Sequence, residues 1–324
     1  MSAVFVVMVA SWAGVILPLF ASKCGHGPGI VVLKCGSLFG AGVLLATALV
    51  HMLFPAMENL THPCLSAFFT EDYPALAMAV VLATILGMHV LHVFIGRHMH
   101  SVHNQRHGIE ATRSETNSDS SKSYDEYSFE HSAYSSTQGD AMSMIDTLPS
   151  SDSHDVHEAA IDLLLVDQHV STIILEVGVA LHSIIIGFVV GVARDEFFTL
   201  FIALSVHQFF EGVALSSTVL HNQFRARVVA VFAIVYGLTT PFGVALGLAV
   251  GSRFDSTTEP SFLVPVGLLD AIAAGLLLYD GLVNVLLPGF GDRFAHEASR
   301  ITLFLFLCSV WLGATLLALL GIWI

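Results

Sequence analysis

TIILEVGVALHSIIIGFVVGVA (172–193) and FFTLFIALSVHQFFEGVALSSTVL (197–220) are two apolar stretches joined by the polar turn Arg194-Asp195-Glu196. His182 lies thirteen residues before the centre of that turn, and His207 lies twelve residues after it. Two antiparallel helices with a rise of about 1.5 Å per residue would therefore hold both imidazole rings at one depth. The rest of the chain can be interpreted as the housing of this pair.

Composition assigns the chain to a membrane. Of its 324 residues, 55% are hydrophobic and 12% are charged, and the mean hydropathy is +0.76. This balance lies far from that of a soluble domain. The net charge of −14 does not describe a uniformly acidic surface, because 13 of the 26 acids fall between residues 97 and 171. Neither a soluble catalytic fold nor nucleic-acid binding receives support.

Eight segments are long and apolar enough to cross the hydrocarbon core of a lipid bilayer, which takes about 17 to 25 residues. We expect an all-α integral membrane protein with three transmembrane helices in residues 1–96 and five in residues 172–324. A polar loop, 97–171, separates the two sets. The segments are 3–22, 31–57, 75–96, 172–193, 197–220, 228–250, 263–287 and 302–323.

Basic residues indicate the orientation. Ten of the 12 Lys and Arg residues flank or occupy one alternate set of loops, and only Arg194 and Arg253 occupy the other set. Because positive charge stays in the cytosol, both termini are expected outside or in an organelle lumen, and the long loop in the cytosol. We expect the plasma membrane, with an organelle membrane as the alternative.

The cytosolic loop 97–171 is rich in Ser, acids and His, and we predict that it is disordered. It contains eight histidines, which favours a weak metal buffer or sensor. The alternative is a solvated linker that happens to be rich in histidine. The four histidines nearest the third span, which itself contains His89 and His92, are His98, His100, His103 and His107.

Ionisable residues in the two central spans require partners. A charged side chain at the bilayer centre costs a few kcal/mol, so it usually faces the bundle interior or a water-filled path. Glu211 follows His207 by four residues and shares its helix face. Two His and one Glu with an open fourth position suit Zn²⁺, and Fe²⁺ is also acceptable. The alternative is that the histidines only pack and bond between helices.

Several motifs resemble the ZIP (Zrt/Irt-like protein) family of divalent-metal transporters, especially its fungal and plant branch. They are LHSIIIGFVVG (181–191), VHQFFEGVALS (206–216), ATALVHMLFPAMENL (46–60), YGLTTPFGVALG (236–247) and AAGLLLYDGLVNVLL (273–287). The resemblance implies an eight-helix bundle with inverted three-helix repeats around a central pair (3+2+3). It also implies transport of Zn²⁺ or a similar ion towards the cytosol.

The resemblance assigns transport-site roles to individual residues. His182, His207 and Glu211 match metal ligands, and Ser183 and Gln208 occupy positions where some relatives hold a second metal. Ile186 stands where those relatives carry an acid. Because its side chain cannot ligate, we expect a site for one metal ion.

An entrance and an exit are expected along the second, third, fourth and seventh spans. His51 matches a second-span histidine that receives the ion from outside, with Glu58 nearer the mouth, unless both only reach towards interfacial water. Asp270 is a further entrance candidate, or a packing residue. The seventh span departs from its relatives, which usually carry an acid at Asn284, and Asp280 one turn earlier is expected to replace it. The exit residues we expect are Glu176, Asp280, Asn284, His89 and His92.

The expected mechanism is binding at the bilayer midplane followed by alternating access, as one group of helices shifts against another. Zn²⁺ is the expected substrate, with Fe²⁺, Mn²⁺ and Cd²⁺ possible; no cofactor is expected, and a homodimer is possible. Two alternatives stay open: a membrane-embedded zinc hydrolase, although the chain contains no HExxH, and a metal sensor or receptor. Net ion flux separates all three.

Overall fold

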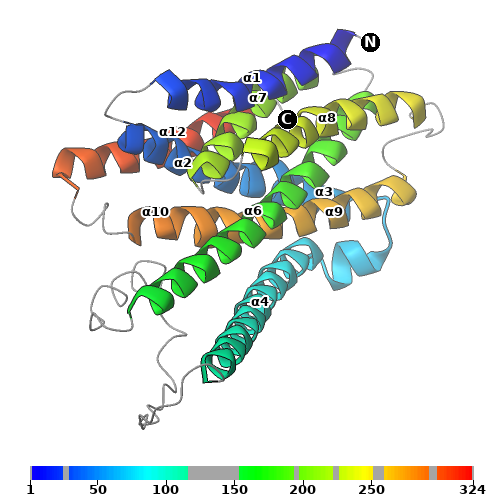
Figure 1. The fold of residues 1–324 in the computed structure, drawn as a ribbon. Helices are drawn as coiled ribbons and strands as arrows, with labels where there is room; N and C mark the ends of the chain where they lie inside the picture. The colour runs from blue at the N-terminus through cyan, green and yellow to red at the C-terminus, as the bar shows by residue number, and fades with distance from the viewer. Residues whose placement is uncertain are drawn as a thin grey trace.

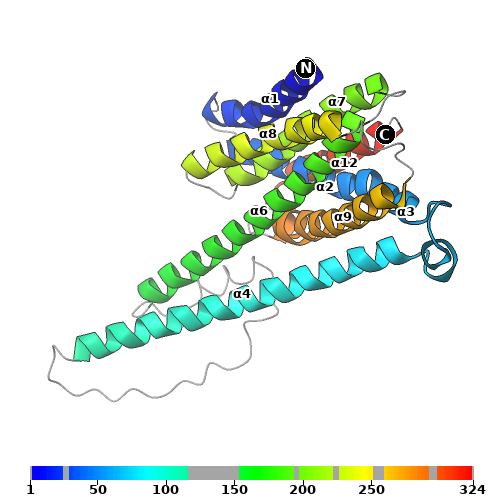
Figure 2. The same cartoon turned by 90° about the vertical axis from the view of Figure 1, so that its right-hand side faces the viewer.

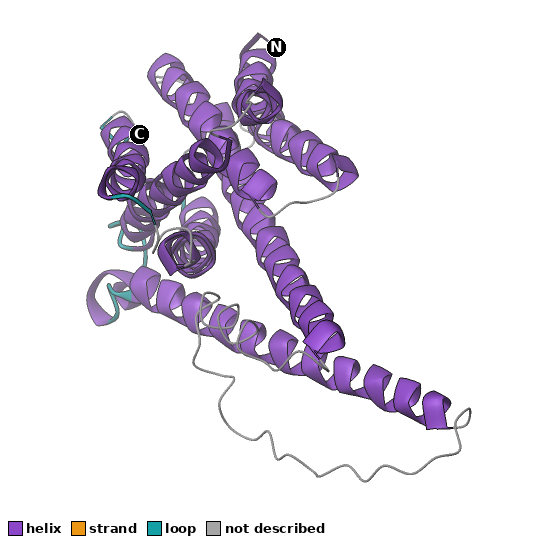
Figure 3. Cartoon of the chain, turned by 60° about the vertical axis from the view of Figure 1, so that its left-hand side comes forward, coloured by secondary structure: helices purple, strands orange, loops and turns teal. Residues whose placement is uncertain are grey.

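The computed structural model describes residues 2–24, 29–115, 153–192, 197–221, 226–250, 259–291 and 298–322. All regular secondary structure in these residues is helical (Figure 3). Seven helical stretches among them are long and apolar enough to cross a membrane. Helix α1 contains a further, shorter apolar stretch, Val4–Phe20. The prediction of an all-helical membrane protein is therefore confirmed at this level.

The elements, with η marking π-helix, follow in chain order. They are α1 (Ser2–Cys24), α2 (Gly29–Ala46), η1 (Thr47–Leu53), α3 (Phe54–Leu60), η2 (Phe68–Asp72), α4 (Leu76–Glu115), α6 (Ser153–Val192), α7 (Phe197–His221), α8 (Ala226–Val250), α9 (Pro260–Tyr279), η4 (Asp280–Leu286), α10 (Leu287–Gly291) and α12 (Arg300–Leu320). Helices α2, η1 and α3 follow one another without a break, as do α9, η4 and α10. The turn at 194–196 lies outside the described residues.

The predicted disorder of the loop 97–171 needs correction at both ends. Helix α4 continues to Glu115, and helix α6 begins at Ser153, so both extend beyond the rest of the bundle at the same end (Figure 2). An apolar span supplies formed helical turns, and adding residues to an existing helix avoids the cost of nucleation. Residues 116–152 lie outside the described part of the chain.

Two π-helical segments interrupt the second and seventh spans, and each is followed closely by a proline. Segment η1 ends at Leu53, two residues before Pro55, and η4 ends at Leu286, two residues before Pro288. Proline has no N–H to donate, and its ring crowds the carbonyl four residues earlier. A wider π turn absorbs this crowding, and such turns frequently occur at functional sites.

The helices form two groups. Helices α1, α6, α7 and α8 pack mainly against one another and are called here the site group. The frame group consists of α2–α3, α4, α9–α10 and α12, with α2 against α12 and α4 against α9. Figure 1 shows α1, α7 and α8 along one edge of the bundle and α4 at the opposite edge. The groups meet where α2 contacts α7 and where α6 contacts α9.

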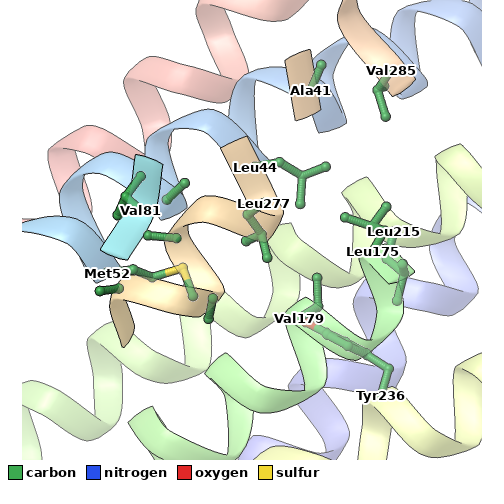
Figure 4. Packing of buried hydrophobic residues seen from close by; sticks show 14 of the residues in the cluster. Ala41, Leu44, Met52, Val81, Leu175, Val179, Leu215, Tyr236, Leu277 and Val285 are labelled. Atoms are coloured by element: carbon green, nitrogen blue, oxygen red, sulfur yellow. The ribbon is translucent and has the colours of Figure 1, made fainter. Parts of the chain in front are cut away.

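One large apolar cluster joins the two groups. Leu175, Val179 and Leu215 of the site group belong to the same cluster as Leu44 and Leu277 of the frame group (Figure 4). Each of these side chains is at most 2% exposed. The core therefore lies between the groups and beside the central histidines.

Candidate metal site

His182, His207 and Glu211 meet in the interior of the site group. Each is at most 1% exposed, and one ligand atom from each lies within 4.8 Å of the others. Nε2 of His207 lies 3.4 Å from Nε2 of His182 and 3.1 Å from Oε1 of Glu211. Nε2 of His182 lies 3.9 Å from the same carboxylate oxygen. Helices α6 and α7 thus bring three ligand atoms to one point.

These distances between ligand atoms fit a cation with tetrahedral coordination. Metal–ligand bonds of about 2.0–2.1 Å at tetrahedral angles put ligand atoms about 3.3 Å apart. Within the described residues, Oε2 of the buried Glu211 carboxylate has no hydrogen-bond partner, and the neighbours of Oε1 are the two histidine nitrogens. Buried polar atoms normally have partners, so this convergence leaves a carboxylate and two imidazoles available for a cation. Soft-to-borderline nitrogen ligands with one oxygen suit Zn²⁺ and Fe²⁺.

Ser183 and Gln208 lie next to this cluster and bond to each other. The Gln208 side-chain amide donates to the Ser183 hydroxyl over 3.4 Å, and both residues are fully buried. The Tyr236 hydroxyl of α8 donates to the main-chain carbonyl of Gln208 over 2.5 Å. These bonds connect α6, α7 and α8 at the level of the histidines. Sequence analysis missed Tyr236, because its partner is a main-chain atom on another helix.

His51 reaches the same place from the frame group. Its ring meets the ring of His207 edge-on, with centroids 4.9 Å apart. Its Nε2 lies 2.8 Å from the carbonyl of Leu317 in α12, and its Nδ1 has no hydrogen-bond partner among the described residues. The carbonyl can only accept, so Nε2 carries the proton and Nδ1 keeps its lone pair. Nδ1 is therefore the atom of His51 that can bind a metal ion.

A cavity of about 170 Å³ extends from His51 and His182 towards the predicted outer side. Its polar lining consists of His51, His182, Asn59 and Asp270, and eight aliphatic or proline side chains, Ile186 among them, complete the wall. A water molecule takes about 30 Å³ of liquid volume, so the cavity can hold a partly hydrated ion. The predicted entrance residues His51 and Asp270 therefore share one cavity with His182.

Glu58 and its neighbour Asn59 differ in their relation to this cavity. Glu58 is exposed and does not line the cavity, whereas Asn59 does. His51, Pro55 and Asn59 recur every fourth residue and so share one helix face. Glu58 is turned away from that face by about 100°. The four-residue spacing from His51 is a signal in the sequence that could have identified Asn59.

The predicted exit residues lie in different parts of the bundle. The Asn284 amide donates to Asp280 Oδ1 over 2.5 Å within η4, and Asp280 is fully buried. His89 is exposed and His92 is half-buried, with their rings 6.4 Å and 6.3 Å from the ring of Tyr279. The side chains of the four predicted loop ligands, His98, His100, His103 and His107, lie outside the described residues.

Glu176 faces a different helix from the other predicted exit residues. A Cβ on Gly178 would lie 2.9 Å from Leu277 Cδ1, so that side of α6 faces α9. Glu176 is two residues away, about 200° around the helix. It lies eleven residues, about three turns, before Gly187, where a Cβ would lie 2.5 Å from the carbonyl oxygen of Thr240. Glu176 therefore faces α8, inside the site group.

Comparisons with known proteins agree with this picture. The family model described as ZIP Zinc transporter matches residues 1–321. The chain is 32% identical to Zinc transporter 5 of Oryza sativa, over 99% of the chain and 86% of the relative. It is also 32% identical to Zinc-regulated transporter 1 of Schizosaccharomyces pombe, over 99% of the chain and 84% of the relative.

An iron-related protein also matches. The chain is 30% identical to Fe(2+) transport protein 2 of Oryza sativa, over 88% of the chain and 75% of the relative. No solved structure matches the chain significantly.

Proposed function

The chain belongs to the ZIP zinc transporter family, and we propose that it carries Zn²⁺ across a membrane towards the cytosol through His182, His207 and Glu211. It is a multi-pass membrane protein and a divalent-metal transporter rather than an enzyme. The single observation that carries the proposed site is the convergence of two imidazoles and one carboxylate at tetrahedral spacing. Similarity to a protein named for Fe²⁺ transport supports Fe²⁺ as a second substrate.

A single ion is expected at this site. Ile186 lines the cavity one turn beyond His182, where a further acid would complete a second site. Its aliphatic side chain offers no ligand, and Ser183 and Gln208 bond to each other. Both polar residues therefore act as positioning neighbours of one ion.

Eight spans in a 3+2+3 arrangement are supported by recurring close contacts. A Cβ on Gly187 of α6 would meet the carbonyl oxygen of Thr240 in α8, and a Cβ on Gly212 of α7 would meet that of Ser11 in α1. The motifs HSIIIG (182–187) and HQFFEG (207–212) align position by position around these glycines. This equivalence relates α6 to α7 and α8 to α1.

The frame group also contains pairs of equivalent helix contacts. A Cβ on Gly42 of α2 would meet the carbonyl oxygen of Val310 in α12, and a Cβ on Gly275 of α9 would meet that of Val81 in α4. The two π segments extend the equivalence, since each has polar residues eight and four positions before a proline. The equivalent residues are Thr47, His51 and Pro55 in the second span and Asp280, Asn284 and Pro288 in the seventh.

Alternating access is supported by a mismatch between equivalent interfaces. Where α2 meets α7, a Cβ on Gly40 would lie 3.0 Å from the Cα of Ala214. Where α6 meets α9, Gly178 lies against Leu277. If the bundle were symmetric, these two contacts would occur at equivalent residues. They do not, so the site group is displaced along the frame group.

Exchanging the two interfaces describes the opposite state. The equivalent of Gly178 is Ala203, and the equivalent of Leu277 is Leu44. In the opposite state, Ala203 would therefore lie against Leu44. In the present structure Leu44 is level with Phe210, seven residues further along α7. At about 1.5 Å per residue, the site group would slide by about 10 Å, and the direction is towards the predicted cytosolic side. His207 would then leave His51, and its equivalent His182 would approach Asn284, the equivalent of His51.

The proposed path follows from this movement. Asp270 and Asn59 attract the ion into the outer cavity, and His51 hands it to the His182–His207–Glu211 site. Asp280, with Asn284 bonded to it, receives the ion after the shift. His89 and His92, whose rings lie near the ring of Tyr279, are the further exit residues of the proposal. Oxygen ligands hold Zn²⁺ less tightly than imidazoles, which favours release. The proposal also places the protein in the plasma membrane and gives the histidines of the loop 97–171 a metal-binding role.

Zinc uptake into liposomes containing the purified protein tests the proposal. The double variant His182→Ala, His207→Ala should lose uptake while keeping the size-exclusion profile of a folded protein. His62→Ala is the matched control, because His62 accepts a bond from the Cys64 amide in the outer segment, away from the site. Uptake by the double variant at the native rate would contradict the proposed site. Absence of any flux in the native protein would contradict transport itself.

A further inference from the structure

Glu176 is a buried carboxylate that the proposed path does not use. It is 6% exposed, and neither of its oxygens has a hydrogen-bond partner among the described residues. Its helix face is the one that packs on α8, about three turns before Gly187. It therefore belongs to the interior of the site group, and it would move together with the metal site.

Among the described residues, no positively charged side chain lies buried beside Glu176. Leu175 and Val179 on either side belong to the apolar cluster, with Leu215 and Tyr236 nearby (Figure 4). Arg227, at the start of α8, is exposed. The described titratable groups on elements packed against α6 are Tyr236 and Arg227 of α8, His207 and Glu211 of α7, Asp270 and Tyr279 of α9, Asp280 of η4, and His89, His92 and Arg97 of α4.

A carboxylate in such surroundings is more stable with a proton than as an isolated anion. A buried charge without a partner carries a large desolvation cost, and ionisable groups inside a membrane usually take part in ion or proton movement. The equivalent position on α7 is occupied by Phe201, so the repeat needs no acid here for packing. Glu176 is thus an additional acid within the half of the bundle that carries the ion.

We propose that Glu176 is a proton-binding site of the site group and exchanges one proton for each divalent ion transported. This inference rests on the proposed transport function and deepens it by naming a second transported species. The proton leaves Glu176 to the outside when the ion binds. Glu176 takes up a proton from the cytosol when the ion is released, so the ion moves inward and the proton outward.

Charge balance gives the reason for this sign. With a divalent ion and an ionised Glu211, the site group carries one net positive charge, which an ionised Glu176 cancels. Without the ion, Glu211 leaves one negative charge, and a protonated Glu176 keeps a second one from being added. In both crossings the group therefore moves through the apolar interior with the smaller net charge, which lowers its desolvation cost.

Zinc uptake under an imposed proton gradient tests the exchange. Liposomes containing the full chain are prepared with an interior more acidic than the exterior, with the membrane potential clamped, and with a pH dye inside. The native protein should take up Zn²⁺ faster than without the gradient, and the interior should become more alkaline as Zn²⁺ enters. Glu176→Gln should take up Zn²⁺ more slowly, because the loaded site group then crosses with one net positive charge, and the remaining uptake should show neither response. Glu176→Asp should retain them, as should Glu71→Gln, which changes an exposed acid in η2.

Proton release on zinc binding provides a second readout that does not need transport. In weakly buffered detergent solution, native protein should release one proton more per bound Zn²⁺ than Glu176→Gln. Equal release by both proteins would overturn the proposal, as would native zinc flux that ignores the proton gradient. A native protein without zinc flux would instead contradict the proposed function, on which the exchange depends.

Discussion

Two engineered cysteine pairs would test whether the site group slides along the frame group. A Cβ on Gly40 would lie 3.2 Å from the Cβ of Ala214. Disulfide-bonded residues have Cβ atoms about 3.5–4.5 Å apart, so Gly40→Cys with Ala214→Cys should form a disulfide after a small adjustment. This pair locks the present state. Leu44→Cys with Ala203→Cys should bond only in the opposite state.

The expected displacement sets the discrimination between the pairs. Ala203 lies seven residues along α7 from the level of Leu44, a separation of about 10 Å along the helix axis. A disulfide tolerates Cα separations only up to about 7 Å, so the second pair cannot close without the shift. The first pair, once closed, should abolish zinc uptake, and reduction should restore it.

The assay uses purified protein in liposomes, in which the four native cysteines have been replaced by Ser. Mild oxidation is followed by mass spectrometry of the linked peptides and by zinc uptake before and after reduction. The native cysteines to be replaced are Cys24, Cys35, Cys64 and Cys308. If the locked Gly40–Ala214 pair transports zinc at the unlocked rate, or if the Leu44–Ala203 pair never closes during turnover, sliding by one helix group is wrong.

Three further predictions concern single residues. Glu211→Gln should weaken zinc binding by at least the tenfold that even an outer-shell partner contributes, measured by calorimetry on the purified protein; unchanged affinity would exclude Glu211 as a ligand. Asp280→Asn should slow zinc uptake more than Asn284→Ala, because the carboxylate supplies the exit ligand and the amide only orients it; the reverse order in an uptake assay would make Asn284 the exit residue. Gly187→Leu should lower the melting temperature, because its Cβ would lie 2.5 Å from the Thr240 carbonyl oxygen and overpacking typically costs about 1–3 kcal/mol. Gly87→Ala, whose Cβ would have no atom within 4 Å, should leave the melting temperature unchanged. Equal melting temperatures of the two variants would argue against close packing of α6 on α8.

The proximity of His182 and His207 was predictable because it follows from residue spacing around a single turn. His182 and His207 lie thirteen and twelve residues from the centre of one turn, and Glu211 shares a helix face with His207, so helix geometry alone brings them together. His51 was predictable only as an entrance candidate. Its edge-on contact with His207 and its bond to Leu317 depend on three helices meeting.

Other features could not be predicted, mainly because they depend on rotation about a helix axis. Glu58 and Asn59 are neighbours in sequence, yet only Asn59 lines the cavity. Glu176 was predicted as an exit residue, and only the packing of α6 shows that its helix face turns towards α8. The predicted disorder at 97–115 and 153–171 overlooked that a helix already formed inside the membrane can continue beyond it.

The sequence by itself determined that the chain is a helical membrane protein with two histidines at one depth and a glutamate about one helical turn away. Apolar length and helical spacing are properties of single segments, so they need no knowledge of neighbours. Only the tertiary structure decided which faces meet: the cavity, the bonds from Tyr236 and Leu317, and the unequal contacts of α2 with α7 and of α6 with α9. Helices in a membrane choose partners through close packing of small residues rather than through hydrophobicity, and that choice depends on both helices at once.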